Sequence, residues 1–544
     1  MKLSELARVY DRVAATRGEP QRVAALARVL ARADLRTLRA VAHFTLGEAV
    51  APQNSDAFGV GPSTIRAALA RVSGRTVEEV NEEVKRAGDM GEVAARLVRG
   101  RDSLTAAELW RRLNGAATAG GEDRLSLVEH VFANTTGGGA KYFTRMALNQ
   151  MRIGAGLVTL VKAIAAAFGV AAAEVERLYA LTNDIGHTAA RARLGAKALK
   201  RAGPSLFRPY QFMNAQKVDD PADIFAALKG KQIIFEVKYD GARLQIHLRK
   251  GRPAEVRLYS RRLNDDTASM PDVVAALREA WRGGDAIMEG EAVAYDAALK
   301  KKQPFQAVLT RLGRKHGVAE KARETPFVLH LFDLLYHDGE DLMNKSQAER
   351  RRRLSSLFRP TERVRMTESV ETDRPAVQER FFKRAVKSGH EGLMAKDPDA
   401  VYTPGRRAEH WMKIKPAFET LDVVVTGGIW GSGRRAGLLS SLIVSVRDRG
   451  GYKTVGKVGT GFSEGLLREL TAKLEPKVIT TRGHTVEIEP EVVIEVDFQD
   501  IQKTDRYAAG YVLRIPRFKR ERTDKSRREA DTLARLKRLY GQTH

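Results

Sequence analysis

Hydrophobic and polar residues follow a helical period through roughly the first 200 residues of the chain. LSELARVYDRVAAT and AELWRRLNGA repeat apolar positions at three- and four-residue spacing, and Ala, Leu, Arg and Glu dominate this part. From about residue 206 the period changes to two, because QIIFEVKYDGARLQIHLRK and AEVRLYSRR alternate around turn residues, with helical segments such as PDVVAALREAW between them. The pattern therefore predicts an all-α region followed by an α+β region.

The pattern changes again after Pro416, where short apolar strands are separated by glycine-rich joints. LDVVVTGGIW, LSSLIVSV, YKTVGKVG and VVIEVDF are these strands, and a basic helix is predicted at the end. Proline continues neither a helix nor a strand, so joints are expected near Gly203-Pro204 and Lys415-Pro416. The predicted domains are 1–204 (all-α), 205–415 (α+β) and 416–544 (a small β-barrel or sandwich with a basic helix).

Charge and composition narrow the class of function. The 544 residues include 93 Lys and Arg against 67 Asp and Glu, a net charge of +26, which favours an anionic partner such as nucleic acid over a merely Arg-biased surface. The absence of cysteine excludes disulfides, thiolate zinc sites and cysteine nucleophiles. The longest apolar stretch, residues 163–173, is shorter than the roughly 20 residues of a membrane span. The charged N-terminus lacks the apolar core of a signal peptide, so we expect a soluble, unexported protein with no membrane partner.

One lysine stands in a pattern that suits covalent chemistry. Alternate side chains of a strand share a face, so Lys238 is predicted to lie between Glu236 and Asp240. Asp240-Gly241 is expected to turn the chain into a second strand that returns as a hairpin. A lysine nucleophile must be neutral, which costs about 4–5 kcal/mol at pH 7 for an ordinary lysine and less near cations or away from water. The alternative for an isolated K-x-D-G is an ion pair on a surface strand.

Further motifs follow along the chain in a fixed order. They are Lys238-Tyr239-Asp240-Gly241 with Arg243, Ser260-Arg261-Arg262, Glu289-Gly290-Glu291, LFDLLY at 331–336, Glu391-Gly392-Leu393-Met394, Arg407 with Trp411, Lys413 and Lys415, and RIPR at 514–517 with RTDK at 522–525. Together they resemble the motifs of the covalent nucleotidyltransferases, and among these the ATP-dependent DNA ligases of the archaeal and eukaryotic replicative type. The third motif is usually D-G-E, so Glu289 is a mild departure that leaves Glu291 intact. QMRIG at 150–154 and NDIG at 183–186 resemble the DNA-binding domain of these ligases.

The resemblance implies a fold and a set of roles. It implies a helical DNA-binding domain, an α+β adenylation domain and a C-terminal β-barrel of the OB-fold type, in which Lys238 takes AMP from ATP. The residues expected to bind the nucleotide are Glu236, Arg243, Arg261, Glu291, Phe332, Arg407, Lys413 and Lys415. Glu391 and Glu291 are expected to bind Mg²⁺, for which Mn²⁺ is expected to substitute. The residues of the last motif expected to close over ATP, with a hinge around Lys415-Pro416-Ala417, are Arg514, Arg517, Arg522, Asp524 and Lys525.

Physical chemistry favours the same residue types. Transfer of AMP to a lysine builds negative charge on phosphate oxygens, so the site needs fixed cations and a divalent metal with hard oxygen ligands. Lys413 and Lys415 would point the same way if WMKIK is a strand. Phe332 offers a flat apolar partner to a purine, and Glu236 could accept a hydrogen bond from the adenine amino group.

Each of these residues has a simpler interpretation when it is taken alone. Phe332 is also a reasonable core residue, Glu391 an ordinary surface carboxylate, Arg407 a solvated turn residue and Trp411 a packing residue. The run Arg350-Arg351-Arg352-Arg353 is interpreted as a solvated helix face with no catalytic role.

Two other features are weighed and given no catalytic role. Gly137-Gly138-Gly139-Ala140-Lys141 lacks the spacing of a phosphate-binding loop, so we expect a loop against the DNA backbone or a plain turn. His247 and His316 have no partner at a metal-ligand spacing and are assigned no role.

The expected function is the sealing of nicks in double-stranded DNA by an ATP-dependent ligase that acts through a lysyl-AMP intermediate. An NAD⁺-dependent ligase usually carries a four-cysteine zinc site, and an RNA ligase or capping enzyme rarely carries this helical front domain. A non-catalytic scaffold would be expected to have lost Lys238, Glu391 or Lys413, and all three are present. We expect a cytoplasmic monomer, nucleoid-associated in a prokaryote. The role in replication or repair and the use of ADP or NAD⁺ are left open. A sliding clamp partner is also left open, since neither end carries a clear clamp-binding peptide.

Overall fold

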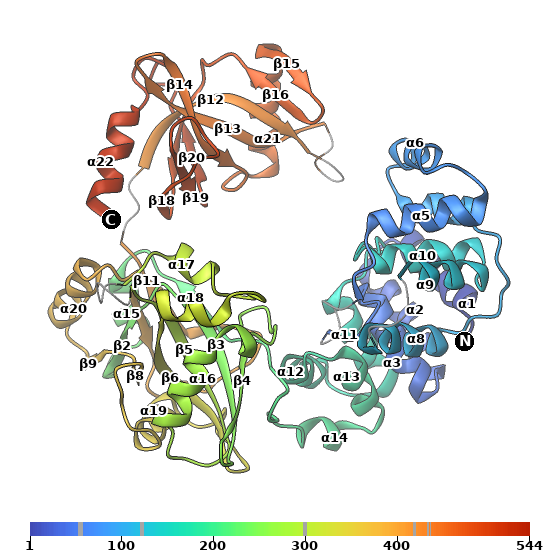
Figure 1. The fold of residues 1–544 in the computed structure, drawn as a ribbon, viewed down its shortest axis with the longest axis horizontal. Helices are drawn as coiled ribbons and strands as arrows, with labels where there is room; N and C mark the ends of the chain where they lie inside the picture. The colour runs from blue at the N-terminus through green and yellow to red at the C-terminus, as the bar shows by residue number, and fades with distance from the viewer. Residues whose placement is uncertain are drawn as a thin grey trace. The chain divides into compact units, whose positions relative to one another are not determined.

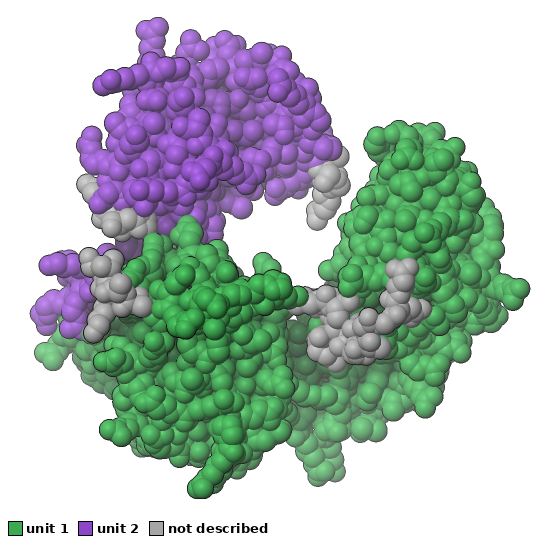
Figure 2. All heavy atoms as spheres, viewed as in Figure 1, with its two compact units in different colours: residues 1–378, 394–413 green, residues 379–393, 414–544 purple. Residues whose placement is uncertain are grey.

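The computed structural model describes residues 1–52, 58–119, 124–296, 302–416, 420–431, 435 and 437–543. The chain forms two compact units, one of Met1–Gln378 with Met394–Lys413 and the other of Glu379–Leu393 with Ile414–His544 (Figure 2). Helices fill the first part of the chain and strands dominate the last (Figure 1). Within the described ranges, no helix has both the length and the apolar character that crossing a membrane requires.

The first part of the chain is the predicted helical region. Its helices are α1 (Leu3–Ala15), α2 (Glu19–Arg32), α3 (Leu35–Leu46), α5 (Pro62–Ser73), α6 (Val77–Ala87), α7 (Met90–Leu97), α8 (Ala106–Ala119), α9 (Arg124–Ala133), α10 (Gly137–Ala147), α11 (Leu157–Phe168), α12 (Ala172–Thr182), α13 (Ile185–Arg193) and α14 (Ala196–Lys200). Local sequence sets their ends: the Asp34 side chain accepts hydrogen bonds from the first amides of α3, and Gly47 ends that helix with φ +82°. The apolar faces of these helices share one core.

The glycine run at 137–139 is not the loop or turn that the sequence suggested. It forms the first turn of α10, and the Thr136 side chain accepts a hydrogen bond from the Gly139 amide. A Cβ at Gly137 would collide with the carbonyl of Ala95 on α7, so glycine is needed because the two helices pack closely there. The run therefore serves helix packing in this structure.

The middle region contains two sheets, as the α+β prediction required. Its elements are β1 (Asn214–Lys217), α15 (Pro221–Ala227), β2 (Ile233–Lys238), β3 (Ala242–Arg249), β4 (Glu255–Tyr259), α16 (Pro271–Ala280), β5 (Ala286–Ala294), α17 (Phe305–Leu309), α18 (Val318–Glu324), β6 (Phe327–His337), β7 (Glu340–Asp341), α19 (Gln347–Ser356), β8 (Val364–Met366), β9 (Ser369–Thr372), α20 (Pro375–Lys387), β10 (Gly392–Lys396) and β11 (Arg407–Ile414). One sheet has the order β1-β11-β10-β2-β9, and the other has the order β4-β3-β5-β6-β7 with β8 beside β6.

The predicted hairpin around Asp240-Gly241 is wrong, because β2 and β3 belong to different sheets. β2 pairs with β9, and β3 pairs with β4 and β5. A Cβ at Gly241 would collide with the carbonyl of Ala292 on β5, so only glycine lets the chain cross from one sheet to the other at this point. Lys238 therefore ends a strand of one sheet, while Arg243 lies on a strand of the other.

The last part of the chain is strand-rich. Its elements are β12 (Thr420–Trp430), β13 (Leu439–Asp448), β14 (Gly451–Val458), α21 (Glu464–Leu474), β15 (Val478–Arg482), β16 (Thr485–Ile488), β17 (Val493–Asp497), β18 (Asp500–Lys503), β19 (Tyr511–Arg514), β20 (Arg517–Glu521) and α22 (Leu533–Thr543). The long strand β12 pairs with β13, β16 and β17, so it organises the sheet, and its apolar residues lie in the core of this domain. The terminal helix was predicted, whereas α21 was not.

Candidate active site

Lys238 is the last residue of β2, and Glu236 lies two positions before it on the same strand. Lys238 is half-buried, whereas Glu236 is only 2% exposed. The buried carboxylate has two cationic partners: an Arg351 guanidinium nitrogen donates to Oε1, and the Lys396 ammonium lies 2.7 Å from Oε2. Charge compensation of this kind is what allows a carboxylate to be buried.

Lys396 was not singled out from the sequence, although it follows the EGLMA segment of the fourth motif directly. It is 1% exposed, and its Nζ lies 4.2 Å from the centroid of the Trp411 ring and 4.7 Å from that of Phe332. Burial lowers the pKa of Lys396, and Glu236 opposes that change. A buried ammonium between a carboxylate and two aromatic rings therefore lies beside the proposed nucleophile's strand.

Phe332 owes its position to an irregularity in β6. The register between β5 and β6 shifts between Glu289 and Gly290, so Phe332 has no residue opposite it on β5. Such a bulge turns a side chain away from the face that strict alternation would give it. Phe332 is buried with its ring edge-on to Trp411, 6.3 Å between centroids and 74° between planes. The core interpretation and the nucleotide interpretation of Phe332 are both compatible with this place.

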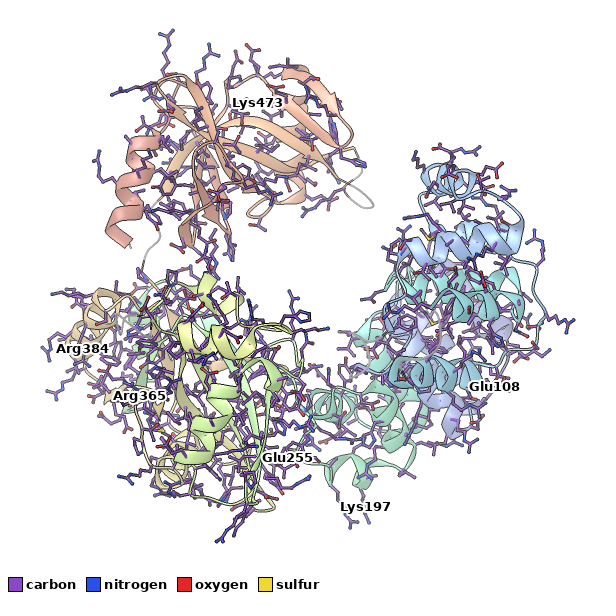
Figure 3. The ribbon with its side chains drawn as sticks, viewed as in Figure 1. Glu108, Lys197, Glu255, Arg365, Arg384 and Lys473 are labelled. Carbon is purple, nitrogen blue, oxygen red and sulfur yellow. The ribbon has the colours of Figure 1, made fainter. Side chains whose placement is uncertain are left out.

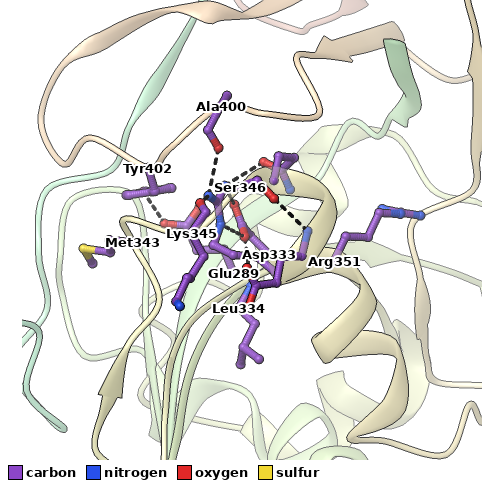
Figure 4. Close-up of polar contacts among 12 residues, drawn as sticks. Glu289, Asp333, Leu334, Met343, Lys345, Ser346, Arg351, Ala400 and Tyr402 are labelled. Atoms are coloured by element: carbon purple, nitrogen blue, oxygen red, sulfur yellow. Dashed lines mark hydrogen bonds and ion pairs between the residues drawn. The ribbon is translucent and has the colours of Figure 1, made fainter. Parts of the chain in front are cut away.

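Arg243 and Glu289 form an ion pair between β3 and β5, in which two guanidinium nitrogens share one carboxylate oxygen. Arg243 Nη2 and Nε lie 2.6 and 3.2 Å from Glu289 Oε2, and Nη1 donates to the Met213 carbonyl at 2.9 Å. Glu289 is fully buried and also accepts hydrogen bonds from the Tyr210 hydroxyl at 3.3 Å and from the Tyr402 hydroxyl. Glu289 and Tyr402 are labelled in Figure 4. Burial raises the pKa of Glu289, and Arg243 opposes this. Glu289, which stands where the third motif usually has Asp, thus holds Arg243 of the first motif in place.

The arginine run at 350–353 is not a solvated face throughout. Arg350 and Asp333 are both 0% exposed, with Nε–Oδ1 at 2.7 Å and Nη2–Oδ2 at 3.1 Å, and Arg350 also donates to the Ala400 carbonyl at 3.0 Å (Figure 4). The helical period places Gln347, Arg350 and Leu354 on the face of α19 that packs toward β6. The solvated interpretation is therefore wrong for Arg350 and Arg351, and it holds for the exposed Arg352.

The remaining predicted residues of the first unit lie around these strands. Glu291 is half-buried and opposite Arg243 in the register of β3 and β5. Arg261 is exposed and donates to Asn214 Oδ1 at 3.1 Å. The two on β11 are Arg407, which is exposed at its start, and Lys413, which is half-buried near its end. β11 ends at Ile414, so the strand that carries Lys413 does not include Lys415.

In the second unit, Glu391 and Lys415 form an ion pair with side chains that are 25% and 10% exposed. Within the described ranges, no group of three or more histidine, aspartate and glutamate side chains is placed to hold a metal ion. Mg²⁺ commonly uses only one or two carboxylates and takes its other ligands from water and substrate phosphates. A partly exposed carboxylate such as Glu391 fits that mode of binding.

The last motif is organised by a residue that the sequence analysis missed, Asp422 on β12. Arg522 Nη1 lies 2.8 Å from both oxygens of Asp422, and Lys525 Nζ lies 2.5 Å from Oδ2. Arg522 also contacts Asp524 at 2.8 Å. Asp422 carries no motif of its own, and it becomes a partner only because the sheet places β12 one strand away from β20, with β17 between them. The other members, Arg514 and Arg517, are half-buried on β19 and exposed on β20.

Many other charged side chains stand at the surface, as Lys197, Arg384 and Lys473 do (Figure 3). With a net charge of +26 over the whole chain, such side chains offer many contacts to an anionic polymer.

Comparisons with known proteins cover nearly the whole chain. Family models described as "DNA ligase N terminus", "ATP dependent DNA ligase domain" and "ATP dependent DNA ligase C terminal region" match residues 2–159, 212–415 and 435–525. The sequence is 39% identical to a DNA ligase of Methanothrix thermoacetophila and 38% identical to one of Thermococcus fumicolans, in both cases over 99% of this chain and 98% of the relative. A solved structure named "Pmar-Lig_PreS3" is 19% identical and covers 95% of this chain and 99% of its own, with a TM-score of 0.59.

Proposed function

The chain belongs to the ATP-dependent DNA ligases, and from that premise we propose that it seals nicks with Lys238 as its nucleophile. The substrate is duplex DNA with a 5′-phosphate and a 3′-hydroxyl at the nick. The expected fold class is confirmed: a helical N-terminal region, an α/β adenylation domain and a strand-rich C-terminal domain. The half-buried position of Lys238 at the end of β2, in the K-x-D-G motif of a full-length family match, carries the proposal.

Three transfers make up the reaction. The neutral Lys238 amine attacks the α-phosphorus of ATP, so a P–N bond forms, the bond to pyrophosphate breaks and the amine loses its proton. A 5′-phosphate oxygen of the nick then attacks the phosphoramidate, which forms an adenylated DNA end and returns the lysine. Finally the 3′-hydroxyl attacks the 5′-phosphate, so that the phosphodiester forms and AMP leaves.

The nucleotide pocket is proposed to combine buried and accessible groups. Glu236 accepts from the adenine amino group and Phe332 stacks on the base, which the adjoining positions of these two side chains near Lys396 support. Glu291 contacts the ribose, and Arg243, opposite it in the register of β3 and β5, is a further cation for the phosphates. Arg261 is exposed enough to reach the reacting phosphate.

The phosphates need positive charge where the transition state builds negative charge. Arg407, Lys413 and Lys415 are proposed to supply it, with Lys415 leaving Glu391 as the phosphates arrive. Glu391, with Glu291, is proposed to hold Mg²⁺ or Mn²⁺. The ion, when bound, neutralises phosphate charge and polarises the α-phosphate. Arg514, Arg517, Arg522, Asp524 and Lys525 are proposed to close over ATP.

We propose the division of labour that the sequence predicted, with domains 1–204, 205–415 and 416–544. The first grips the duplex through its phosphates without reading bases, so its affinity should fall steeply with salt. The hinge for closure is proposed at Lys415-Pro416-Ala417, of which Ala417 lies outside the described residues. The enzyme is proposed to act as a monomer on DNA in the cytoplasm, and a sliding clamp remains a candidate partner.

The test is covalent labelling with α-labelled ATP and Mg²⁺, followed by denaturation. Wild-type protein should retain label and Lys238→Ala should not, and nicked DNA added before denaturation should discharge the label. Arg352→Ala, a change at an exposed arginine, is the matched control and should label like wild type.

Other outcomes would contradict specific parts of the proposal. Label from NAD⁺ but not from ATP would overturn the assignment of ATP. Absence of label with any nucleotide, in protein freed of bound AMP, would favour the scaffold alternative.

A further inference from the structure

Arg351 of α19 connects a helix to the strand pair that carries the nucleophile. Its side chain is 13% exposed, and its guanidinium makes three contacts: Nη1 donates to Glu236 Oε1, and Nη2 donates to the Thr367 carbonyl at 2.9 Å and to Ser369 Oγ at 2.8 Å. Ser369 lies opposite Glu236 in the register of β2 and β9. The guanidinium is therefore fixed by a side-chain acceptor on β9, the strand that pairs with β2, and by a backbone acceptor in the short segment that leads into β9.

The Glu236 carboxylate is held at both oxygens. Oε1 takes Arg351, and Oε2 takes Lys396 at 2.7 Å. Each carboxylate oxygen has two lone-pair directions, so one cation on each leaves acceptor capacity for a ligand. The two charge-assisted contacts also prevent the carboxylate from rotating. They therefore preorganise it to accept a further hydrogen bond from one direction.

We propose that Arg351 is a positioning residue that fixes Glu236 as the acceptor for the 6-amino group of adenine and thereby makes the first step selective for ATP. A 6-oxo group is itself a hydrogen-bond acceptor, so it would face the Glu236 carboxylate with no proton between the two oxygens. A base without a 6-substituent would leave the remaining lone pair of the buried Glu236 carboxylate without a donor. This inference rests on the proposed contact between Glu236 and adenine and goes beyond it by assigning selectivity to a residue outside the nucleotidyltransferase motifs.

Substitution of Arg351 tests the role of the Glu236 carboxylate more cleanly than substitution of Lys396. Lys396 Nζ also lies against the rings of Trp411 and Phe332, so its loss would disturb the proposed stacking partner of the base as well. Arg351 has no ring contact of this kind among the described residues. Removal of the Arg351 side chain should therefore weaken the hydrogen bond between Glu236 and the edge of the base and leave the stacking of the base on Phe332 unchanged.

The experiment measures single-turnover lysyl-nucleotide formation with ATP, with purine riboside triphosphate, which lacks the amino group, and with inosine triphosphate, which has a 6-oxo group. Wild type should prefer ATP over both by about 10- to 100-fold in the ratio of the maximal rate constant to the half-saturating nucleotide concentration, as expected for a charge-assisted contact. In Arg351→Met the half-saturating concentration of ATP should rise roughly tenfold with the maximal rate constant unchanged, because the contact is made in ground and transition states alike. The half-saturating concentration of purine riboside triphosphate should change less than about twofold, since that base never uses the contact.

Matched variants separate positioning from general damage. Arg352→Met removes an exposed arginine from the same helix and should leave the preference intact. Arg351→Lys should restore part of the preference. Glu236→Met, which has no carboxylate or amide acceptor, should lose the preference alone, and adding Arg351→Met to it should cause no further loss, because the two residues act through one contact.

Three results would overturn the inference. The first is equal losses with ATP and purine riboside triphosphate in Arg351→Met. The second is a preference that survives Arg351→Met while Glu236→Met removes it. The third is additive losses in the double variant. A Glu236→Met variant that keeps the full ATP preference would instead overturn the proposed adenine contact itself, and the inference with it, while leaving the ligase assignment standing.

Discussion

Two ion pairs of the adenylation domain and two of the second unit differ in how far they are removed from water. In the adenylation domain, Asp333 and Arg350 are fully buried, and Glu289 is fully buried beside Arg243. In the second unit, Glu391 and Lys415 keep 25% and 10% of their side chains exposed, and Lys525 of the Asp422 cluster keeps 30%.

This difference in burial distinguishes ion pairs that hold the fold together from ion pairs that can exchange a partner for a ligand. A buried pair loses most of its compensation if one member leaves, so it holds strands and helices in one arrangement. A pair near water can release a member to an incoming phosphate or metal at much smaller cost, because solvent replaces the lost partner. We infer that the buried pairs shape the nucleotide pocket, whereas the accessible pairs hold cations and a carboxylate ready for ligands that arrive during the reaction.

The largest effect should come from breaking the buried pair. Asp333→Ala leaves Arg350 buried without its counter-charge, which should lower the free energy of unfolding of the first unit by about 3–5 kcal/mol. Urea unfolding followed by a probe in the first unit measures this. Arg352→Ala on the same helix should change it by less than about 0.5 kcal/mol, and equal losses in both variants would contradict the distinction.

Breaking the accessible pair should affect catalysis and leave stability nearly unchanged. Lys415→Met should slow lysyl-AMP formation by about 10²- to 10³-fold, the usual effect of removing one fixed donor to a developing phosphate charge. The melting temperature should stay close to that of wild type, since the pair is partly exposed. A large loss of stability with normal adenylation would reverse the roles assigned to the two kinds of pair.

Salt should distinguish the two kinds of pair in the same way. The loss of stability in Asp422→Ala should shrink as NaCl rises from about 0.05 to 1 M, because salt screens the partly exposed Arg522 and Lys525 contacts. The loss in Asp333→Ala should stay nearly constant over the same range. If the loss of stability depends on salt equally in the two variants, burial does not determine how strongly salt screens these two ion pairs.

A smaller effect concerns pH and two buried histidines. Burial lowers the pKa of His43, but its hydrogen bonds to Asp184 and Glu48 outweigh burial, so the net pKa is raised. A raised pKa adds stability that is present below the unfolded value of about 6.5 and is lost as pH rises through the folded pKa. His43→Asn should therefore flatten the decline of melting temperature above pH 6.5.

His247 should show the opposite sign. Burial lowers its pKa to about 3, with Nδ1 accepting from the Phe207 amide at 2.9 Å and Nε2 lying 2.9 Å from Gln245 Oε1. Its contribution is present above about pH 6.5 and is lost as pH falls toward 3. His247→Gln should flatten the acid limb of the melting curve, and an unchanged acid limb would contradict this assignment.

The sequence predicted the order of regions and most of the motif positions, because helical and strand periods and the K-x-D-G motif are local properties. It failed where tertiary structure decides. Whether Asp240-Gly241 closes a hairpin or crosses between sheets depends on the approach of Ala292. The bulge at Phe332, the burial of Arg350 and the partnership of Asp422 with Arg522 all depend on residues distant in the chain. The site roles themselves remain predictions.

The central claim is that Lys238, and no other lysine, receives AMP. Lys396 is the informative rival, because burial lowers its pKa and so favours the neutral amine, although it is only 1% exposed. Protein labelled with ATP and Mg²⁺ should be digested under conditions that preserve the phosphoramidate, and its peptides mapped by mass spectrometry. The account predicts AMP on the peptide that contains Lys238. AMP on the peptide that contains Lys396, with Lys238 unmodified, would contradict it.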